Sequence, residues 1–210
     1  LAKSMRISII EMLYNVKTGH PGGSLSAVEI VADLYFNQMN IDPENPQWED
    51  RDRFIAGKGH CAPIMYVALA EKGFFPKEEL KNLRQLGSIL QGHPCMKTSG
   101  IDMSSGPLGL GLSAGIGMGI AAKLNNKNYY TYVLLGDGEI QEGQIWEAAM
   151  SAVKFKTDNV ITILDNNGVQ LDGTNDEIMP LGDIGKKFES FGWNVIHVDG
   201  HSISEIDQAI

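Results

Sequence analysis

The sequence has 210 residues, and 17 Lys and Arg against 26 Asp and Glu give it a net charge of −9. Folding buries roughly 70% of the surface of a chain this long, which allows one core without disulfides or metals, and 24 glycines with 20% charged residues exclude a coiled coil or a disordered chain. Acidity without a Lys/Arg cluster argues against nucleic acid or an anionic membrane as partner, and no apolar run is long enough to span a bilayer.

Helices are predicted for most of the first half. Apolar residues at helical spacing predict a helix over residues 2–17 and a second one, capped by Ser24 or Ser26, that runs to about Phe36. Arg53–Ala56 is a short strand candidate, and further helices are expected over Cys61–Lys72 and Lys77–Leu86. Residues 87–106 show no periodicity, and loops of this length inside a domain are usually functional.

The second half alternates short apolar strands with helices. A helix is expected to start near Gly109, and then come the following elements: strands Tyr132–Leu135, Val160–Leu164 and Asn194–Val198, and helices Ile145–Phe155, Ile184–Phe191 and Ile203 onward. Such alternation indicates an α/β fold with a central, mostly parallel sheet and helices on both faces.

Carboxylate and amide side chains follow two of these strands. Gly-Asp-Gly comes after Leu135, with the carboxylate at Asp137, and Asp-Asn-Asn-Gly comes after Leu164. Ligands of parallel sheets bind beyond the carboxyl ends of the strands, and hard oxygen donors suit Mg²⁺ or Ca²⁺. Asp-Gly and Asn-Gly are also common turn sequences, so ordinary turns are the alternative.

The glycine-rich run Gly106–Gly119 contains a GxGxxA pattern, but no strand precedes it, which argues against a nicotinamide site. Its glycines either allow close helix packing or leave helix amides free to hold an anion. Three histidines, His20, His60 and His93, each follow a glycine in a loop. They can donate to phosphate or move protons, whereas His197, within a strand, and His201, at a helix start, are interpreted as structural.

Six motifs occur in register over nearly the whole chain, at 18–23 (TGHPGG), 52–60 (DRFIAGKGH), 91–94 (QGHP), 106–109 (GPLG), 136–143 (GDGEIQEG) and 165–168 (DNNG). Together they resemble transketolase, most closely the separate N-terminal subunit of two-chain transketolases. The 27 residues between Gly138 and Asn166 are also similar to the thiamine diphosphate signature.

The resemblance implies a thiamine diphosphate-binding fold and a set of cofactor contacts. Mg²⁺, or Ca²⁺ in its place, would be held by Asp137, Asn167 and the carbonyl of Val169. His60 and Gly138 would contact the diphosphate. The loop Gly106, Pro107, Leu108 would line the cofactor.

The resemblance also implies how the substrate and a second chain are used. His20 and His93 would act on the sugar phosphate as catalytic residues, and Glu142 would join a carboxylate network at a subunit interface. The activity implied is transfer of a two-carbon ketol unit from a ketose phosphate to an aldose phosphate, in the pentose phosphate pathway. Leu110 and Cys95 depart from the family pattern, so local contacts there are expected to differ.

Residues 1–210 are thus expected to form a single diphosphate-binding domain that lacks its C-terminal end, active only with a subunit carrying the pyrimidine-binding domain, in a dimer or α2β2 assembly. Two cysteines without a CxxC pattern and no signal-peptide pattern indicate the cytoplasm. The alternatives are another thiamine diphosphate enzyme, such as 1-deoxyxylulose-5-phosphate synthase, or a non-catalytic cofactor-binding assembly module.

Overall fold

A three-stranded parallel sheet lies at the centre of the computed structural model, which describes all residues 1–210. Its strands, in spatial order, are β1 (Arg53–Ala56), β2 (Thr131–Gly136) and β3 (Val160–Asp165). The register sets Gly136 opposite Asp165, so β2 and β3 end at the same level. The predicted α/β class with a parallel sheet is confirmed, and each of the three strands is found within a residue or two of its predicted bounds.

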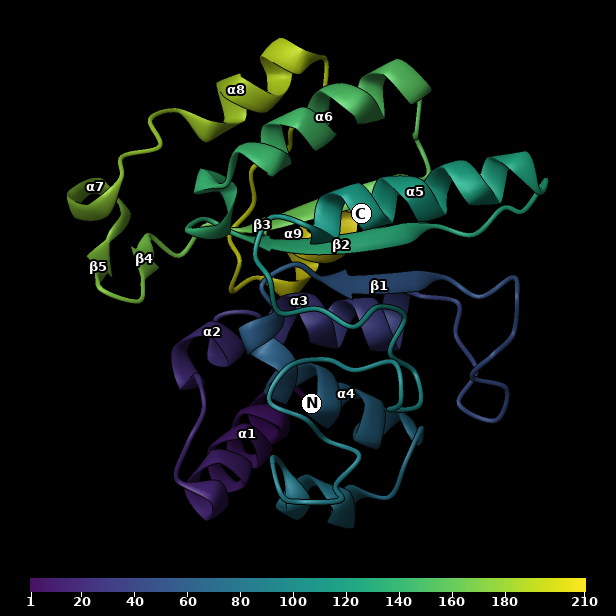
Figure 1. The fold of residues 1–210 in the computed structure, drawn as a ribbon, viewed down its shortest axis with the longest axis vertical. Helices are drawn as coiled ribbons and strands as arrows, with labels where there is room; N and C mark the ends of the chain where they lie inside the picture. The colour runs from purple at the N-terminus through teal and green to yellow at the C-terminus, as the bar shows by residue number, and fades with distance from the viewer.

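Helices cover both faces of this sheet (Figure 1). Below it, and before β2 in the chain, lie α1 (Ala2–Val16), α2 (Pro21–Leu25), α3 (Val28–Asp33) with its π-helical continuation η1 (Leu34–Gln38), the 3₁₀ turn η2 (Gly59–Cys61), α4 (Ala62–Lys72) and the 3₁₀ segment η3 (Lys77–Asn82). Above it lie α5 (Gly111–Leu124), α6 (Gly143–Phe155), which follows the 3₁₀ turn η4 (Glu139–Gln141), and α8 (Ile184–Phe191).

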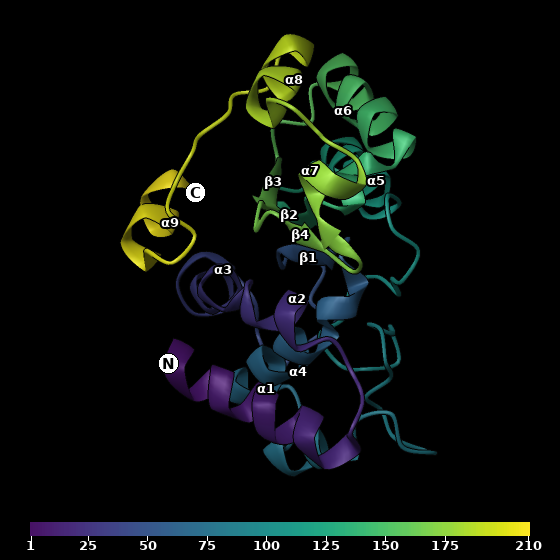
Figure 2. The ribbon, with the colours of Figure 1, turned by 90° about the vertical axis from the view of Figure 1, so that its left-hand side faces the viewer.

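The remaining elements lie at the rim. A small antiparallel hairpin, β4 (Val169–Gln170) and β5 (Gly173–Thr174), and the single turn α7 (Asn175–Ile178) stand at the carboxyl ends of the strands. The last helix, α9 (Ile203–Ala209), crosses to the lower side and packs beside α3, as Figure 2 shows. None of the helices is both long and apolar enough to cross a membrane.

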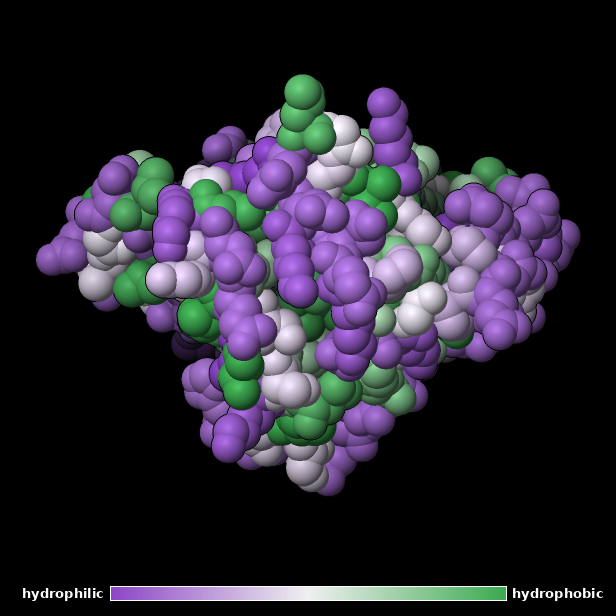
Figure 3. Space-filling view, turned by 90° about the horizontal axis from the view of Figure 1, so that it is seen from below, coloured by the Kyte–Doolittle hydropathy of each residue, from purple (hydrophilic) through white to green (hydrophobic).

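The hydrophobic core consists of two clusters, one on each face of the sheet. The larger contains buried residues of α1, α3 and α4, and the smaller joins α5, α6 and α8 to β2. Polar side chains predominate on the lower surface of the molecule, with small groups of hydrophobic ones between them (Figure 3). Burial on both faces explains why β2, buried at every position, is a continuous apolar run without alternation.

Two predicted elements are wrong. The helix expected over Lys77–Leu86 is only the 3₁₀ segment η3, because the chain turns back at Arg84, where φ is +60° and the amide donates to Leu90 O (2.8 Å). The segment Asn194–Val198 forms no strand. A cavity of about 1130 Å³ lies between it and β3, so neither has a neighbour for a ladder on that side, and Ile196 is 57% exposed.

The helix predicted to run from Ser24 or Ser26 to Phe36 is present but divided. It starts earlier, with Pro21 at the first position of α2, and breaks before α3, whose N-cap residue is Ala27. Neither serine caps it: the hydroxyl of Ser26 instead donates to Asp165. The first helix, α1, matches its predicted range to within one residue.

The glycines of α5 lie where the helix meets the sheet. An added Cβ would come within 2.7 Å of Gly57 Cα at Gly111, 2.4 Å of Val133 at Gly115 and 2.5 Å of Val160 at Gly119. These glycines recur every four residues and so face one way, whereas Gly117 is open to solvent with no atom within 4 Å of such a Cβ. Close helix packing, the first of the two interpretations of this run, accounts for three of its glycines.

We expect Gly111→Ala to destabilise the protein by about 1–3 kcal/mol, because the methyl group meets backbone that cannot move aside. Gly117→Ala, on the outer face of the same helix, should instead stabilise it by about 0.5–1 kcal/mol. Urea unfolding followed by circular dichroism measures both changes. Equal effects of the two variants would contradict the packing role of Gly111.

Candidate functional site

Asp137 is the buried carboxylate at the carboxyl edge of the sheet. It follows β2 directly and is 2% exposed. Its Oδ1 accepts from the amide of Gly138 (2.8 Å), and its Oδ2 accepts from the amide of Gly168 (2.6 Å) in the turn after β3. Because β2 and β3 are parallel neighbours that end in register, the carboxylate ties the two turns together.

The other two predicted metal ligands, Asn167 and Val169, lie in the turn that Asp137 holds. Both are exposed, and Asn167 Oδ1 accepts from Val169 N (3.0 Å). One carboxylate, one amide oxygen and one carbonyl are hard donors, a set too small to complete an octahedron without water or ligand oxygens. The protein has no group of three acidic, histidine or cysteine side chains that could hold a metal by themselves. These residues fit a magnesium ion that is shared with an anionic ligand.

A buried ion pair supports this edge from below. Lys58, just after the end of β1, is 1% exposed, and its Nζ lies 2.5 Å from Asp165 Oδ2. The hydroxyl of Ser26 donates to the same carboxylate oxygen (2.6 Å). The network joins the end of α2, the turn after β1 and the end of β3. This ion pair was not predicted from the sequence, although a lysine between two glycines directly after an apolar strand was the available signal.

Glu139 is a second buried carboxylate that was not predicted from the sequence. Its Oε1 accepts from Gly109 N (3.0 Å), and its Oε2 accepts from Gly136 N (3.1 Å). Burial raises the pKa of Glu139, and the two backbone hydrogen bonds lower it again in part. A Cβ added at Gly57 would lie only 2.6 Å from Glu139 Oε1, so the absence of a side chain at Gly57 leaves room for the carboxylate of Glu139. Glu139 therefore holds the GPLG loop against the ends of β1 and β2.

His60 and His20 form one wall of the site. Their rings meet edge to face with centroids 5.5 Å apart, and a Cβ on Gly23 would lie 2.6 Å from the His60 ring. Burial, followed by the charge of Lys58, lowers the pKa of His60 to about 4, so the imidazole is neutral at pH 7. His20 Nδ1 is buried without a hydrogen-bond partner. Both rings can thus serve a ligand.

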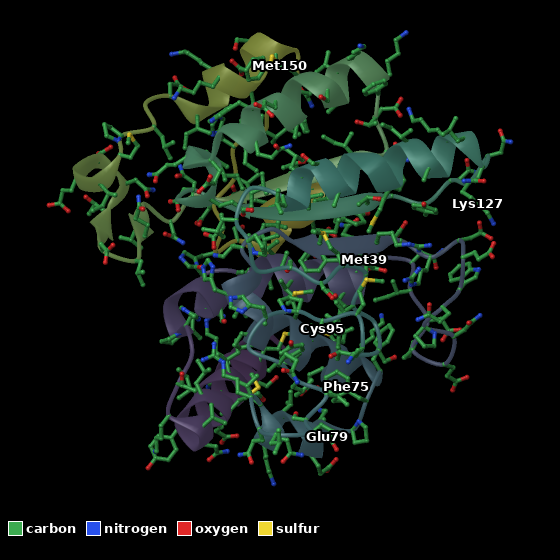
Figure 4. The ribbon with its side chains drawn as sticks, in the orientation of Figure 1. Met39, Phe75, Glu79, Cys95, Lys127 and Met150 are labelled. Atoms are coloured by element: carbon green, nitrogen blue, oxygen red, sulfur yellow. The ribbon has the colours of Figure 1, made fainter.

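His93 and the GPLG loop lie on the next side of the site. His93 is exposed, and a Cβ added at Gly106 would lie 3.5 Å from its ring. Partial burial of the imidazole, followed by the charge of Arg84, lowers the pKa of His93. Gly59 packs against Gly106, where a Cβ would lie 3.0 Å from the amide nitrogen. The structure therefore brings the histidines and the GPLG loop together. Figure 4 shows this loop region beside α4, with Cys95 labelled.

Several predicted site residues lie on the open side. Pro107 and Leu108 are exposed, and so is Glu142, the N-cap residue of α6. A Cβ added at Gly109, whose φ is +85°, would lie 2.8 Å from Glu142 Cβ. The backbone of the GPLG loop therefore packs directly against the side chain of Glu142. Gly138 packs against Gln170 of the hairpin. Pro107, Leu108 and Glu142 thus lie at the surface of the protein, beside the GPLG loop.

No strand leads into the GxGxxA pattern, and α5 begins only at Gly111, which agrees with the argument against a nicotinamide site. The arrangement instead combines oxygen donors and imidazoles at the carboxyl edge of the sheet. This edge is where α/β domains with parallel sheets bind their ligands.

Comparison with known proteins agrees with this class and gives the family. The sequence model described as "Transketolase, thiamine diphosphate binding domain" matches residues 1–210. The chain belongs to the transketolase family and comprises a thiamine diphosphate-binding domain.

Relatives include proteins named as transketolase subunits and longer chains named as transketolase. The chain is 43% identical over 201 residues to one subunit of the apulose-4-phosphate transketolase of Phocaeicola vulgatus, covering 96% of this chain and 72% of that one. It is 45% identical over 210 residues to the SqwG subunit of the 6-deoxy-6-sulfo-D-fructose transketolase of a Clostridium species, covering 100% of this chain and 76% of that one. It is 42% identical to human transketolase, covering 99% of this chain but only 34% of the human one.

Solved structures agree. The crystal structure of transketolase from Campylobacter jejuni superposes with a TM-score of 0.94 at 33% identity, covering 99% of this chain and 34% of that one. Residues 1–210 therefore have the fold of about a third of that transketolase chain. The predicted family and fold are confirmed.

Proposed function

We propose that this chain is the diphosphate-binding, N-terminal subunit of a split transketolase, which transfers a two-carbon ketol unit between sugar phosphates. The single observation that carries this is the link from Asp137 through the Gly168 amide to the turn of Asn167 and Val169. In this proposal the link keeps the turn that carries Asn167 and Val169 beside Asp137, so that their oxygens would share one metal ion. Similarity over 72–76% of two relatives named as transketolase subunits supports the split arrangement.

In this proposal Asp137, Asn167 and the Val169 carbonyl hold Mg²⁺, or Ca²⁺ in its place, and His60 and Gly138 contact the diphosphate. Thiamine diphosphate, when bound, supplies the carbanion and the electron sink for cleavage of the ketose. The loop from Gly106 through Pro107 to Leu108 lines the cofactor.

His20 and His93 are proposed to orient the sugar hydroxyls and to move protons there. His93 can accept a proton because its lowered pKa leaves it neutral at pH 7. An exposed imidazole at the rim of the site reaches a substrate without rearrangement. Glu142 is proposed to meet a carboxylate of another subunit, in keeping with its exposure.

The exposed residues of the GPLG loop support the proposal that a second chain completes the site. Leu108 is 41% exposed at the place where the cofactor would lie, so this wall does not enclose a ligand alone. We infer that a partner subunit carries the pyrimidine-binding domain and completes the site, in a dimer or α2β2 assembly. Residues 1–210 are then a single diphosphate-binding domain of a cytoplasmic enzyme of the pentose phosphate pathway.

Isothermal titration should detect weak binding of thiamine diphosphate and Mg²⁺ to this chain alone. Binding should become at least roughly tenfold tighter once the partner subunit is added, because the partner buries the other face of the cofactor. Equal affinity with and without the partner would refute the split site. An assay comparing ketose and aldose phosphates with pyruvate plus glyceraldehyde 3-phosphate separates transketolase from a deoxyxylulose-phosphate synthase.

A further inference from the structure

A second cavity lies at the amino ends of the strands, at the opposite edge of the sheet from Asp137. Its volume is about 630 Å³, which is within the range of small-molecule sites. Lys127, one of its lining residues, lies in Figure 4 on the opposite side of the molecule from the hairpin at the carboxyl ends. The cavity is therefore separate from the candidate site for the diphosphate.

Two loops form the walls of this cavity. The loop from Asn40 to Asp52 is closed at its base, where Asp52 N donates to Asn40 O (3.0 Å) and Asp52 Oδ2 accepts from Asn40 N (2.8 Å). Asp52 Oδ1 accepts from Tyr130 N (2.7 Å) in the second loop. At the rim, Lys127 joins the two loops through an ion pair with Asp50 (2.8 Å). The walls are therefore held in place by the protein itself.

The side chain of Tyr132 reaches this cavity from β2 and has an unused hydroxyl. Tyr132 is 4% exposed and lines the cavity. Its hydroxyl makes no hydrogen bond within the protein, whereas the hydroxyl of Tyr129 donates to Met118 O (3.2 Å). The ring of Tyr130 lies 6.4 Å from that of Tyr132, and Trp48 lines the same cavity. Buried polar groups nearly always have a partner, so the hydroxyl marks a place for a ligand atom.

The charges that act on the Tyr132 hydroxyl are negative. Burial raises its pKa to about 12, and the causes that follow burial are Asp52, Tyr130 and Asp33, without a cation. Lys127, the cation at the rim, is already paired with two acids. A positive group placed at the hydroxyl would therefore be attracted, and a negative one repelled.

Asp33 is a buried carboxylate with one unused oxygen. It is 1% exposed, its Oδ1 accepts from Asn37 (2.6 Å), and its Oδ2 has no hydrogen-bond partner. It precedes the π-helical segment η1, and π-helical turns are frequent at functional sites. Because an uncompensated buried charge is costly, a cation in the neighbouring cavity would stabilise this carboxylate.

We propose that this cavity binds an organic cation, a protonated amine with a flat apolar body, whose ammonium group meets the Tyr132 hydroxyl. The rings of Trp48 and Tyr130 would contact the apolar body and attract its charge, and the phenol oxygen accepts a hydrogen bond from an ammonium group. A metal ion fits less well, since no three acidic, histidine or cysteine side chains lie together. The inference is independent of the proposed function, because it uses none of the residues of the cofactor site.

Three probes of similar size and different charge test the proposal. The chain is titrated with benzylamine, benzyl alcohol and benzoate, and the indole N–H NMR signals of its three tryptophans are followed. Only the Trp48 signal should move, because Trp146 and Trp193 pack on Phe188, outside this cavity. Benzylamine should bind about tenfold more tightly than benzyl alcohol, and benzoate more weakly still. Trp48→Phe, which removes one signal, assigns it.

Two variants separate a cation site from an apolar hollow. Tyr132→Phe should weaken benzylamine binding about tenfold, since it removes the acceptor and keeps the ring. Asp33→Asn should weaken benzylamine binding about 3- to 10-fold and leave the affinity for benzyl alcohol within about twofold. Tyr14→Phe, an exposed tyrosine of α1, and Asp176→Asn, an exposed acid of α7, are the matched controls and should change neither affinity.

Equal affinity for the three probes would overturn the proposal, because the cavity would then have no preference for positive charge. A Trp48 signal that does not respond to benzylamine would overturn it as well, and so would unchanged benzylamine affinity in Tyr132→Phe. Circular dichroism shows whether the variants are folded. If Asp33→Asn does not fold, Tyr132→Phe and the comparison of the three probes decide.

Discussion

Replacing Lys58 with methionine is expected to destabilise the protein by about 3–5 kcal/mol, because the carboxylate of Asp165 then stays buried without its cation. The two side chains are 2% and 7% exposed, and their charged atoms lie 2.5 Å apart. Only the Ser26 hydroxyl would remain to donate to Asp165. Thermal or urea unfolding of the purified variant measures the loss.

A double-mutant cycle shows whether the loss comes from the pair. Asp165→Asn should also destabilise the protein, and the double variant with Lys58→Met should be more stable than the sum of the two losses predicts, since neither buried charge remains. Additive losses would mean that Lys58 acts through packing alone. Lys77→Met, which breaks an exposed ion pair with Glu71, is the control and should cost less than about 1 kcal/mol.

The sheet was predictable because its signals are local. The strand Arg53–Ala56 has the bounds expected from the sequence, and β2 and β3 differ by a residue or two. A continuous apolar run needs no knowledge of its neighbours to be recognised as a buried strand. Asn194–Val198 has a similar composition but faces a cavity, and a strand requires a partner for its ladder.

The site was predictable in part. Asp137 and the turn at Asn167 follow from the rule that parallel strands present ligand groups at their carboxyl ends. His20, His60 and His93 lie in three loops that are far apart in the chain. The repeated Gly-His pattern therefore marked these histidines as candidates for function, but it could not show that the fold brings them together. Resemblance to a family, and not spacing, supplied their roles.

Tertiary contacts determine the parts that the sequence did not indicate. By sequence Glu139 is one of two glutamates in the motif at 136–143, and only the approach of Gly109 and Gly136 turns it into a buried acceptor. Likewise the helical spacing at Lys77–Leu86 is real, but Leu86 is fully exposed and the turn at Arg84 ends the segment. Apolar spacing predicts a helix only where the apolar face is covered.

Asp137→Asn is expected to weaken metal-dependent binding of thiamine diphosphate by more than about 100-fold, since it removes the one carboxylate among the proposed metal ligands. The amide still accepts from one of the two backbone donors, Gly138 or Gly168, so the fold should persist. Titrating the chain and its partner subunit with cofactor, in Mg²⁺ and in EDTA, measures the effect. The wild type and the control Asp172→Asn, an exposed acid on the neighbouring hairpin, should both bind far more tightly with Mg²⁺. An Asp137→Asn variant that keeps the full Mg²⁺ dependence would show that this carboxylate serves only to join the two turns.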